Sequence, residues 1–236
     1  MKGVLSLPTA LSAVLVIGQA AAEERTADLE LVLLADATGS IDDGEIAFQR
    51  QGYASAITHP AVLDAIMKGY DGRIAVTYVE WGNAFSQEVV APWTIIDGPE
   101  SAAAFADVLT GTPRLAFGRN AIGSALAAAQ TLIEGNDIDG HRKVIDFSAD
   151  SANSWTGLPV EDVRAGIIAS GITINGLAIL CRDCSGRPVS YDLEAAFATR
   201  IVGGPVVTAD GETSFADAVR KKLILEIADL GDADAR

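Results

Sequence analysis

Oxygen-bearing side chains gather at Asp36–Ser40, directly after an apolar run. Asp36, Thr38 and Ser40 place one carboxylate and two hydroxyls at alternate positions of the chain. Hard cations such as Mg²⁺ take oxygen ligands of this kind. A simpler interpretation is that Ser40 or Asp42 caps a helix that follows. Taken alone, the pattern leaves a metal site and a helix cap both open.

Two further segments offer the same chemistry. Asp150 follows the strand-like segment Lys143–Phe147, and Asn120, whose side chain has a carbonyl oxygen, precedes an alanine-rich helix. The alternative roles are a turn with Ser151 and Asn153 for Asp150, and an N-cap for Asn120. If these segments meet at one edge of a sheet, their oxygens would face the same crevice as those of the first motif.

The only cysteines are Cys181 and Cys184, in the sequence Cys-Arg-Asp-Cys. In an oxidising compartment we expect a disulfide between them, which would mainly rigidify a turn because the loop it closes is so short. A thioredoxin-like redox pair is the alternative. Such a pair normally lies between a strand and a helix start, whereas here loop-like residues follow it. The structural disulfide is therefore the favoured interpretation.

Alternating strand and helix patterns must position these residues. The run Leu29–Ala35 is almost continuously apolar, as in a strand buried on both faces. Further strands are expected at 73–81, 87–96, 143–147, 172–180 and 206–208, and helices at 42–58, 60–67, 100–109, 121–133, 159–169, 193–200 and 215–228. This alternation predicts a three-layer α/β/α, Rossmann-like domain with a mostly parallel sheet and one antiparallel edge strand, 87–96. Ligands of such sheets lie at the carboxyl ends of the strands.

Composition narrows the class of protein. The 236 residues include 32 acidic and 17 basic ones, giving a formal charge of −15, and 49% are apolar. This apolar content excludes a disordered chain, which would combine high charge with low hydrophobicity. The acidity argues against a nucleic-acid binder, which needs clustered lysine and arginine, and against docking on anionic lipid. We find no linker and no internal repeat, so one domain is expected over residues 28–230.

The N-terminus has the order of a secretory signal peptide. Lys2 is followed by the mostly apolar segment Val4–Ile17 and by small residues that predict cleavage after Ala22. The apolar segment is too short to span a membrane, so no stable membrane insertion is expected. Residues 23–27 and 231–236 are expected to be an N-terminal tail and a flexible C-terminal tail. Export would place the protein in a bacterial periplasm or outside the cell.

Together these segments resemble a von Willebrand factor A-like (vWA) domain, in particular a secreted bacterial family with that fold. The resemblance covers nearly all of the mature chain. The fold carries Asp-x-Ser-x-Ser after its first strand, a Thr ahead of a helix with Gly-x-Ala-Leu, and an Asp after a central strand. These positions form its metal-ion-dependent adhesion site (MIDAS). The matching residues are Asp36, Thr38, Ser40, Asn120 ahead of Gly123-Ser124-Ala125-Leu126, and Asp150.

The resemblance implies a divalent cation, Mg²⁺ first and Mn²⁺ or Ca²⁺ as alternatives. Thr38 and Ser40 would bind it directly, while Asp36 and Asp150 would act largely through water. One coordination position would stay open, and the carboxylate of a partner protein could complete it.

The sequence departs from the family pattern at two positions. Thr38 replaces a serine but keeps the hydroxyl. Asn120 replaces a threonine, so that an amide oxygen with a longer reach stands where the family has a hydroxyl. Arg119, next to it, adds a positive charge that would oppose a metal.

The predicted function is a secreted, non-enzymatic module that binds a protein, with Trp155 as a candidate partner contact. One alternative is a metal-dependent hydrolase or phosphatase using Asp36 and Asp150; it lacks a second acid in the first motif and a plausible base. We expect His59 at a helix start and His141 in the polar turn 137–142, both on the surface. The other alternative is a thiol oxidoreductase using the two cysteines.

Overall fold

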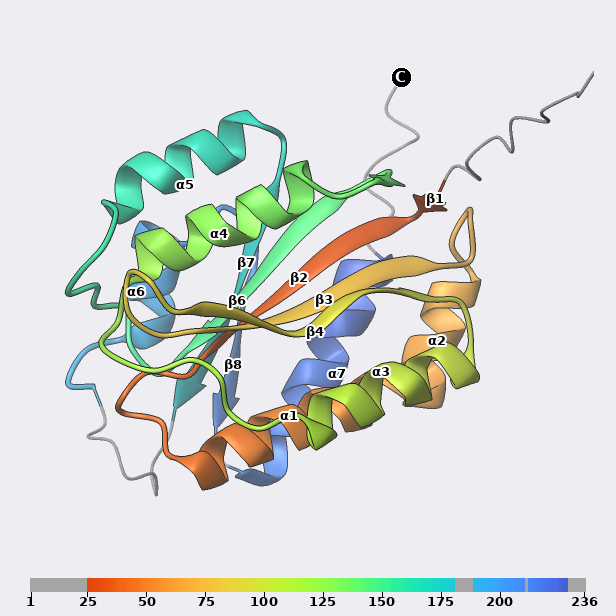
Figure 1. The fold of residues 1–236 in the computed structure, drawn as a ribbon, viewed down its shortest axis with the longest axis horizontal. Helices are drawn as coiled ribbons and strands as arrows, with labels where there is room; N and C mark the ends of the chain where they lie inside the picture. The colour runs from red at the N-terminus through yellow and green to blue at the C-terminus, as the bar shows by residue number, and fades with distance from the viewer. Residues whose placement is uncertain (1–24, 181–188, 211, 229–236) are drawn as a thin grey trace, which may run out of the picture.

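Six strands form the central sheet of the computed structural model, which describes residues 25–180, 189–210 and 212–228. Only β3 and β4 pair antiparallel, and all other neighbours are parallel, so β4 is the antiparallel edge strand (Figure 1). In spatial order the strands are β4 (Gln87–Ile96), β3 (Ile74–Trp81), β2 (Leu29–Asp36), β6 (Lys143–Ala149), β7 (Thr173–Leu180) and β8 (Val206–Asp210).

The central strand β2 is buried along its whole length. It lies between β3 and β6, which explains its continuous apolar sequence. Leu31 and Leu33 belong to the core on one face of the sheet, whereas Val32 and Leu34 belong to the core on the other. This alternation fixes the register, because a slip of one residue would exchange the two faces.

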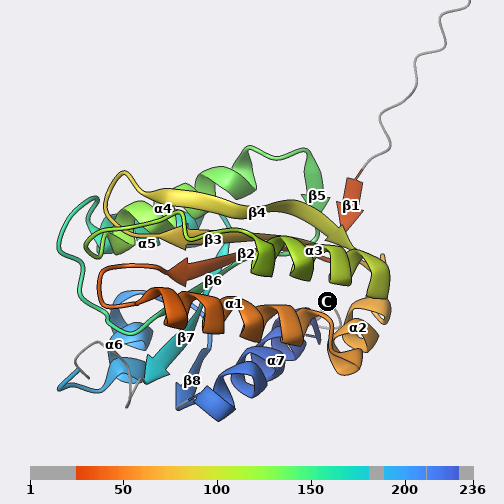
Figure 2. The same ribbon diagram turned by 60° about the horizontal axis from the view of Figure 1, so that its bottom comes forward.

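Helices cover both faces of the sheet (Figure 2). One face is packed by α1 (Asp43–Ile57), α2 (Pro60–Met67), α3 (Pro99–Gly111) and α7 (Glu212–Ala228), the other by α4 (Ile122–Glu134), α5 (Val160–Ala169) and α6 (Leu193–Arg200). No helix within the described residues is long and apolar enough to cross a membrane.

The structure confirms the predicted three-layer, mostly parallel vWA-like fold, and it adds a small sheet outside the main one. Here β1 (Arg25–Ala27) pairs in parallel with β5 (Ile138–Gly140). The sequence predicts an N-terminal tail at residues 25–27 and a turn at residues 137–142, so both short strands differ from the prediction. Strands of three residues carry too short a pattern for sequence reasoning to find them.

Candidate metal centre

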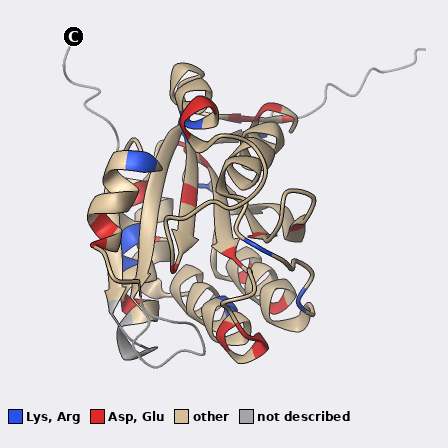
Figure 3. Cartoon of the chain, turned by 90° about the vertical axis from the view of Figure 1, so that its left-hand side faces the viewer, with Lys and Arg blue, Asp and Glu red and all other residues tan. Residues whose placement is uncertain are grey.

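The carboxyl ends of β2 and β6 bring the first and third predicted motifs together. The two strands are parallel neighbours, with Ala35 opposite Ser148. Asp36 ends β2, and Asp150 directly follows β6, so the two carboxylates leave the sheet side by side. Figure 3 looks onto the end of the molecule where these loops lie. The chain segments that sequence reasoning assigned to one crevice therefore do meet there.

Asp36 is fully buried and only half satisfied. Its Oδ1 accepts a hydrogen bond of 2.8 Å from the amide of Thr38. Its Oδ2 has no hydrogen-bond partner in the part of the chain that the structure describes. Burial, and next the charge of Asp150, raise the pKa of Asp36 to about 8, although hydrogen bonds from Thr38 and from the backbone of Asp150 act in the opposite direction. A carboxylate in this state needs either a proton or a cation.

Asp150 shares this condition. Its Oδ1 is buried without a hydrogen-bond partner among the described residues. Burial raises its pKa, while a hydrogen bond from the Ser40 side chain acts in the opposite direction. The hydroxyl oxygens of Thr38 and Ser40 are 3.3 Å apart. Two carboxylates and two hydroxyls thus converge on one small volume, and this donor set suits a hard divalent cation.

The helix cap and the turn that could have explained Ser40 and Asp150 are formed by other residues. Asp42 caps α1, because its carboxylate accepts from the amide of Glu45 and the Glu45 side chain accepts from the amide of Asp42. The turn after β6 is closed by the Ser151 hydroxyl, which accepts from the Asn153 amide. Ser40 and Asp150 are therefore not required as cap or turn residues.

Asn120 joins the second loop to the third. It is buried, and its backbone carbonyl accepts from the amides of Trp155 and Thr156 at 2.8 and 3.3 Å. Ala121, not Asn120, is the N-cap of α4, and this cap has no side-chain hydrogen bond. Arg119 lies with its guanidinium 5.4 Å from the ring centre of Trp155. The Trp155 indole thus contacts the positive charge of Arg119, which the sequence placed next to the site.

Small residues let the third loop approach α4. A Cβ on Gly123 would lie 2.1 Å from the carbonyl oxygen of Leu158, and Gly157 has a φ of +85°. Both positions therefore require glycine. The hydroxyl of Ser124 accepts from the Leu158 amide at 3.2 Å. The Gly-Ser sequence at the start of α4 thus serves loop packing next to the candidate site.

Sequence reasoning missed Arg114, which anchors the first loop. Its guanidinium donates to the backbone carbonyls of Ala37, Thr38 and Ile41 at 2.6, 3.1 and 2.9 Å. It also forms an ion pair with Asp43 at 3.1 Å. Because these contacts run through carbonyl groups of the loop, no side-chain motif in the sequence indicates them.

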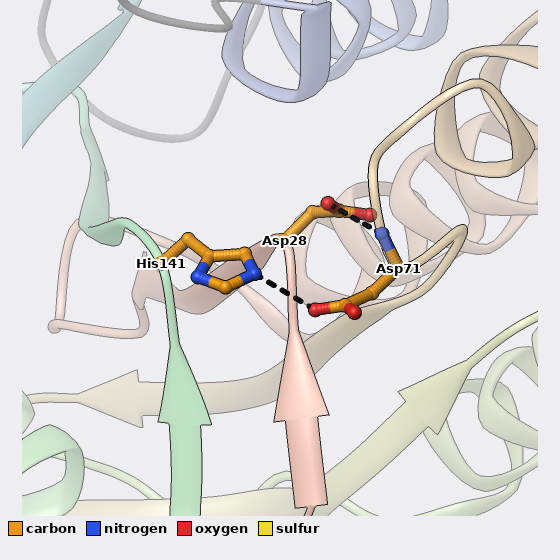
Figure 4. A group of neighbouring side chains, drawn as sticks. All are labelled: Asp28, Asp71 and His141. Atoms are coloured by element: carbon orange, nitrogen blue, oxygen red, sulfur yellow. Dashed lines mark hydrogen bonds and ion pairs between the residues drawn. The ribbon is translucent and has the colours of Figure 1, made fainter. Parts of the chain in front are cut away.

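A second cluster lies at the opposite end of β2 (Figure 4). Asp28, Asp71 and His141 place one ligand atom each within 4.8 Å of one another. Asp28 accepts from the backbone amides of Asp71 and Arg73, at 3.0 and 3.3 Å. His141, which lies on the surface as predicted, pairs through Nε2 with Asp71 at 2.9 Å. His59 caps α2 through Nδ1. Neither histidine lies at the Asp36 end.

Three predicted features lie outside the described residues: the cysteine pair Cys181 and Cys184, the signal peptide and the C-terminal tail. The disulfide, the export of the chain and the identity of the metal ligands all stay predictions.

Solved structures of vWA-like proteins resemble this chain. Mussel byssus proximal thread matrix protein 1, solved with a zinc-occupied MIDAS motif, has 16% identity and a TM-score of 0.61, over 87% of this chain and 49% of its own. The pilus adhesin SpaC of Lactobacillus rhamnosus GG has 11% identity and a TM-score of 0.60, and the match covers 86% of this chain and 31% of SpaC. BatB of Bacteroides thetaiotaomicron has 16% identity and a TM-score of 0.53, and the match covers 85% of this chain and 98% of BatB.

These identities show the fold alone. The chain spans about half of the mussel protein and about a third of SpaC. No protein with a curated description matches it. The model of the family described as protein of unknown function DUF1194 matches residues 26–231. The chain therefore belongs to the DUF1194 family, and its fold is vWA-like.

Proposed function

We propose that this protein is a non-enzymatic binding module that recognises a partner protein through a divalent cation. The cation would be held by Asp36, Thr38, Ser40, Asn120 and Asp150. The observation that carries the proposal is the pair of buried carboxylate oxygens, Asp36 Oδ2 and Asp150 Oδ1, that lack hydrogen-bond partners among the described residues. A buried acceptor without a partner is costly, and a bound cation would remove that cost.

The donor set favours Mg²⁺, with Mn²⁺ or Ca²⁺ as alternatives, because every candidate ligand atom is an oxygen. Arg114 would support the site by fixing the carbonyl groups of the loop that carries the two hydroxyls. By the resemblance to vWA domains, a carboxylate of the partner would complete the coordination. The mussel matrix protein and the pilus adhesin make a binding role the natural one to test.

A catalytic role has less support at this edge. Neither of the two histidines is near it, and position 38 carries a hydroxyl where a phosphoryl-transferring enzyme of this kind would place a second acid. We also propose that the chain is exported to the periplasm or the medium. The N-terminal sequence of the protein purified from cells would test this by starting at Glu23.

Calorimetric titration of the metal-free protein with Mg²⁺ and Mn²⁺ tests the proposal. We expect one site in the wild type and none in Asp36→Ala. Asp64→Ala removes an exposed acid from α2 and should bind as the wild type does, which controls for the loss of one negative charge. Absence of binding in the wild type would refute the metal-dependent function.

A further inference from the structure

Large apolar side chains are exposed around the candidate metal centre. Phe85, Phe117, Trp155 and Leu158 are 96%, 54%, 60% and 49% exposed. We call these four residues the apolar collar. Soluble proteins rarely gather exposed apolar groups unless the surface binds something. The collar is the more notable because only 6% of the chain is aromatic.

Backbone hydrogen bonds tie the collar to the metal-site loops. The amide of Gly39, between Thr38 and Ser40, donates to the carbonyl of Gly118 at 2.9 Å. Phe117 precedes that glycine, and its own carbonyl accepts from Asn83 in the β3–β4 turn at 3.0 Å. Phe85 belongs to the same turn. Backbone hydrogen bonds thus connect these loops to the first metal motif.

The other half of the collar is connected to the second and third motifs. The Trp155 amide donates to the carbonyl of Asn120, and the Leu158 amide donates to the hydroxyl of Ser124. The loop that carries both collar residues begins at Asp150. Three of the four side chains thus belong to segments that carry candidate ligands, and the turn that carries Phe85 contacts one of these segments, so we expect a partner bound to the cation to reach the collar.

Two arginines hold rings of the collar. The guanidinium of Arg114 lies 4.8 Å from the ring centre of Phe117, and that of Arg119 lies 5.4 Å from Trp155. Such cation–π contacts restrict the rings before a partner arrives. Arg119 is exposed. It places positive charge beside the site on a chain whose formal charge is −15. Arg119 therefore offers one positive charge, next to the carboxylates of the site, with which an acidic side chain of a partner can pair.

A hollow beside the collar offers room for a partner's side chain. A cavity of about 450 Å³ is lined by Trp155 and Leu158 together with Pro159, Val160 and Ile201. Its size falls within the range of small-ligand sites, and its lining combines apolar side chains with polar groups. Polar atoms of Glu161, Asp162 and Arg200 also border it.

We propose that the partner is recognised through a polypeptide segment in which an acidic residue is flanked by large apolar residues. The acid would reach the cation and Arg119, while its apolar neighbours would cover the collar. This inference rests on the proposed metal-dependent function and adds the chemistry of the partner. Buried aromatic anchors of this kind commonly dominate the energy of binding at an interface.

Selection of random dodecapeptides displayed on phage, against the immobilised full chain in Mg²⁺, tests this inference. We expect the selected peptides to share an aspartate or glutamate with large apolar residues on one or both sides. The affinity of one selected peptide is then measured by fluorescence anisotropy. We expect Phe117→Ser and Trp155→Ser each to weaken it by about tenfold or more. Tyr70→Ser, at the opposite end of the molecule and 89% exposed, should change it less than about twofold.

The outcomes separate this inference from the proposed function. If a chelator abolishes binding but the collar substitutions do not weaken it, the collar has no role and the metal-dependent function stands. If the collar substitutions weaken binding and a chelator does not, the collar is confirmed as a binding surface and the metal-dependent function fails. Peptides without an acid, without apolar neighbours, or no selected peptides at all would overturn the inference.

Discussion

The two ends of β2 carry carboxylates in opposite states. At the amino end, Asp28 is buried but both its oxygens accept backbone amides, from Asp71 and Arg73. At the carboxyl end, Asp36 is equally buried but its Oδ2 accepts no hydrogen bond from the described residues. The contrast separates an acid whose two oxygens both have partners from an acid with one unpaired oxygen, which the proposed cation would fill. Burial does not distinguish the two acids, because both are buried. The carboxylate oxygen without a hydrogen-bond partner does.

The surroundings of the two acids differ in the same sense. Near Asp28 the backbone is adapted to the carboxylate: a Cβ on Gly69 would lie 2.1 Å from its Oδ2. Near Asp36 a second carboxylate, that of Asp150, raises its pKa in addition to burial. Two acids placed together without a cation weaken the fold locally. A cation bound at the proposed site would remove that cost.

The largest effect is expected at the amino end. Asp28→Ala should lower the free energy of unfolding by about 3 kcal/mol, because it leaves the amides of Asp71 and Arg73 without their charged acceptor. Urea unfolding followed by circular dichroism measures this loss. Mg²⁺ binding by the folded variant should be unchanged. Loss of Mg²⁺ binding in a variant that still folds would mean that the two ends are not separate in role.

The carboxyl end is expected to respond to pH with a definite sign. The folded pKa of Asp36 is about 8, against an ordinary value of 3.8, so folding keeps its proton between these values. Its contribution to the stability of the metal-free protein is therefore fully present below about pH 4 and is lost as the pH rises through about 8. Asp36→Asn should thus be the more stable protein at pH 8, by about 2 kcal/mol.

The wild type must be compared with Asp36→Asn, because a second buried acid, Asp146, also makes the free energy of unfolding fall as the pH rises. Burial, and next the charge of Glu226, raise the pKa of Asp146 to about 7. Unfolding in urea between pH 5 and 8, with a chelator present, measures both curves. Parallel curves for the wild type and Asp36→Asn would show that Asp36 is not the strained acid inferred here.

A smaller effect is expected from the anchor of the first loop. Arg114→Ala removes the donors to the carbonyls of Ala37, Thr38 and Ile41, so the hydroxyls of that loop lose their fixed position. We expect Mg²⁺ affinity to fall by about tenfold, which is about 1.4 kcal/mol. Arg164 is a matched control, because it also donates to a backbone carbonyl, that of Val202, but not to one in the first loop. Equal losses in Arg114→Ala and Arg164→Ala would indicate general destabilisation.

Sequence reasoning predicted the layers, the antiparallel edge and the convergence of the loops, because these follow from the alternation of buried strands with helices. It also placed Asp36 and Asp150 at the carboxyl ends of two strands, where the structure has them, and those strands are neighbours. It did not find Arg114 or β5, for a common physical reason. Both depend on backbone groups brought together by the fold, and the pairing of a carbonyl or of a three-residue strand leaves no pattern of side-chain types.

The pairing of His141 with Asp71 was also invisible, because the two residues lie far apart in the sequence, and it gives the smallest expected effect. The His141–Asp71 pair joins two loops, but the His141 side chain is half exposed, so solvent screens the interaction. His141→Gln should change the free energy of unfolding by less than about 1 kcal/mol. Thermal unfolding followed by circular dichroism measures the change.

The same variant asks whether the amino end could also be a metal site. Its three candidate ligands, drawn in Figure 4, lie within 4.8 Å of one another. However, Asp28 already accepts from two amides, and His141 is already paired with Asp71. A zinc ion would have to displace that pairing, because zinc binds the deprotonated histidine nitrogen. We therefore expect added Zn²⁺ not to raise the midpoint of thermal unfolding through this cluster. A rise in the wild type that His141→Gln abolishes would make both ends of β2 metal sites, and the satisfied carboxylate of Asp28 would no longer distinguish a structural acid from a ligand.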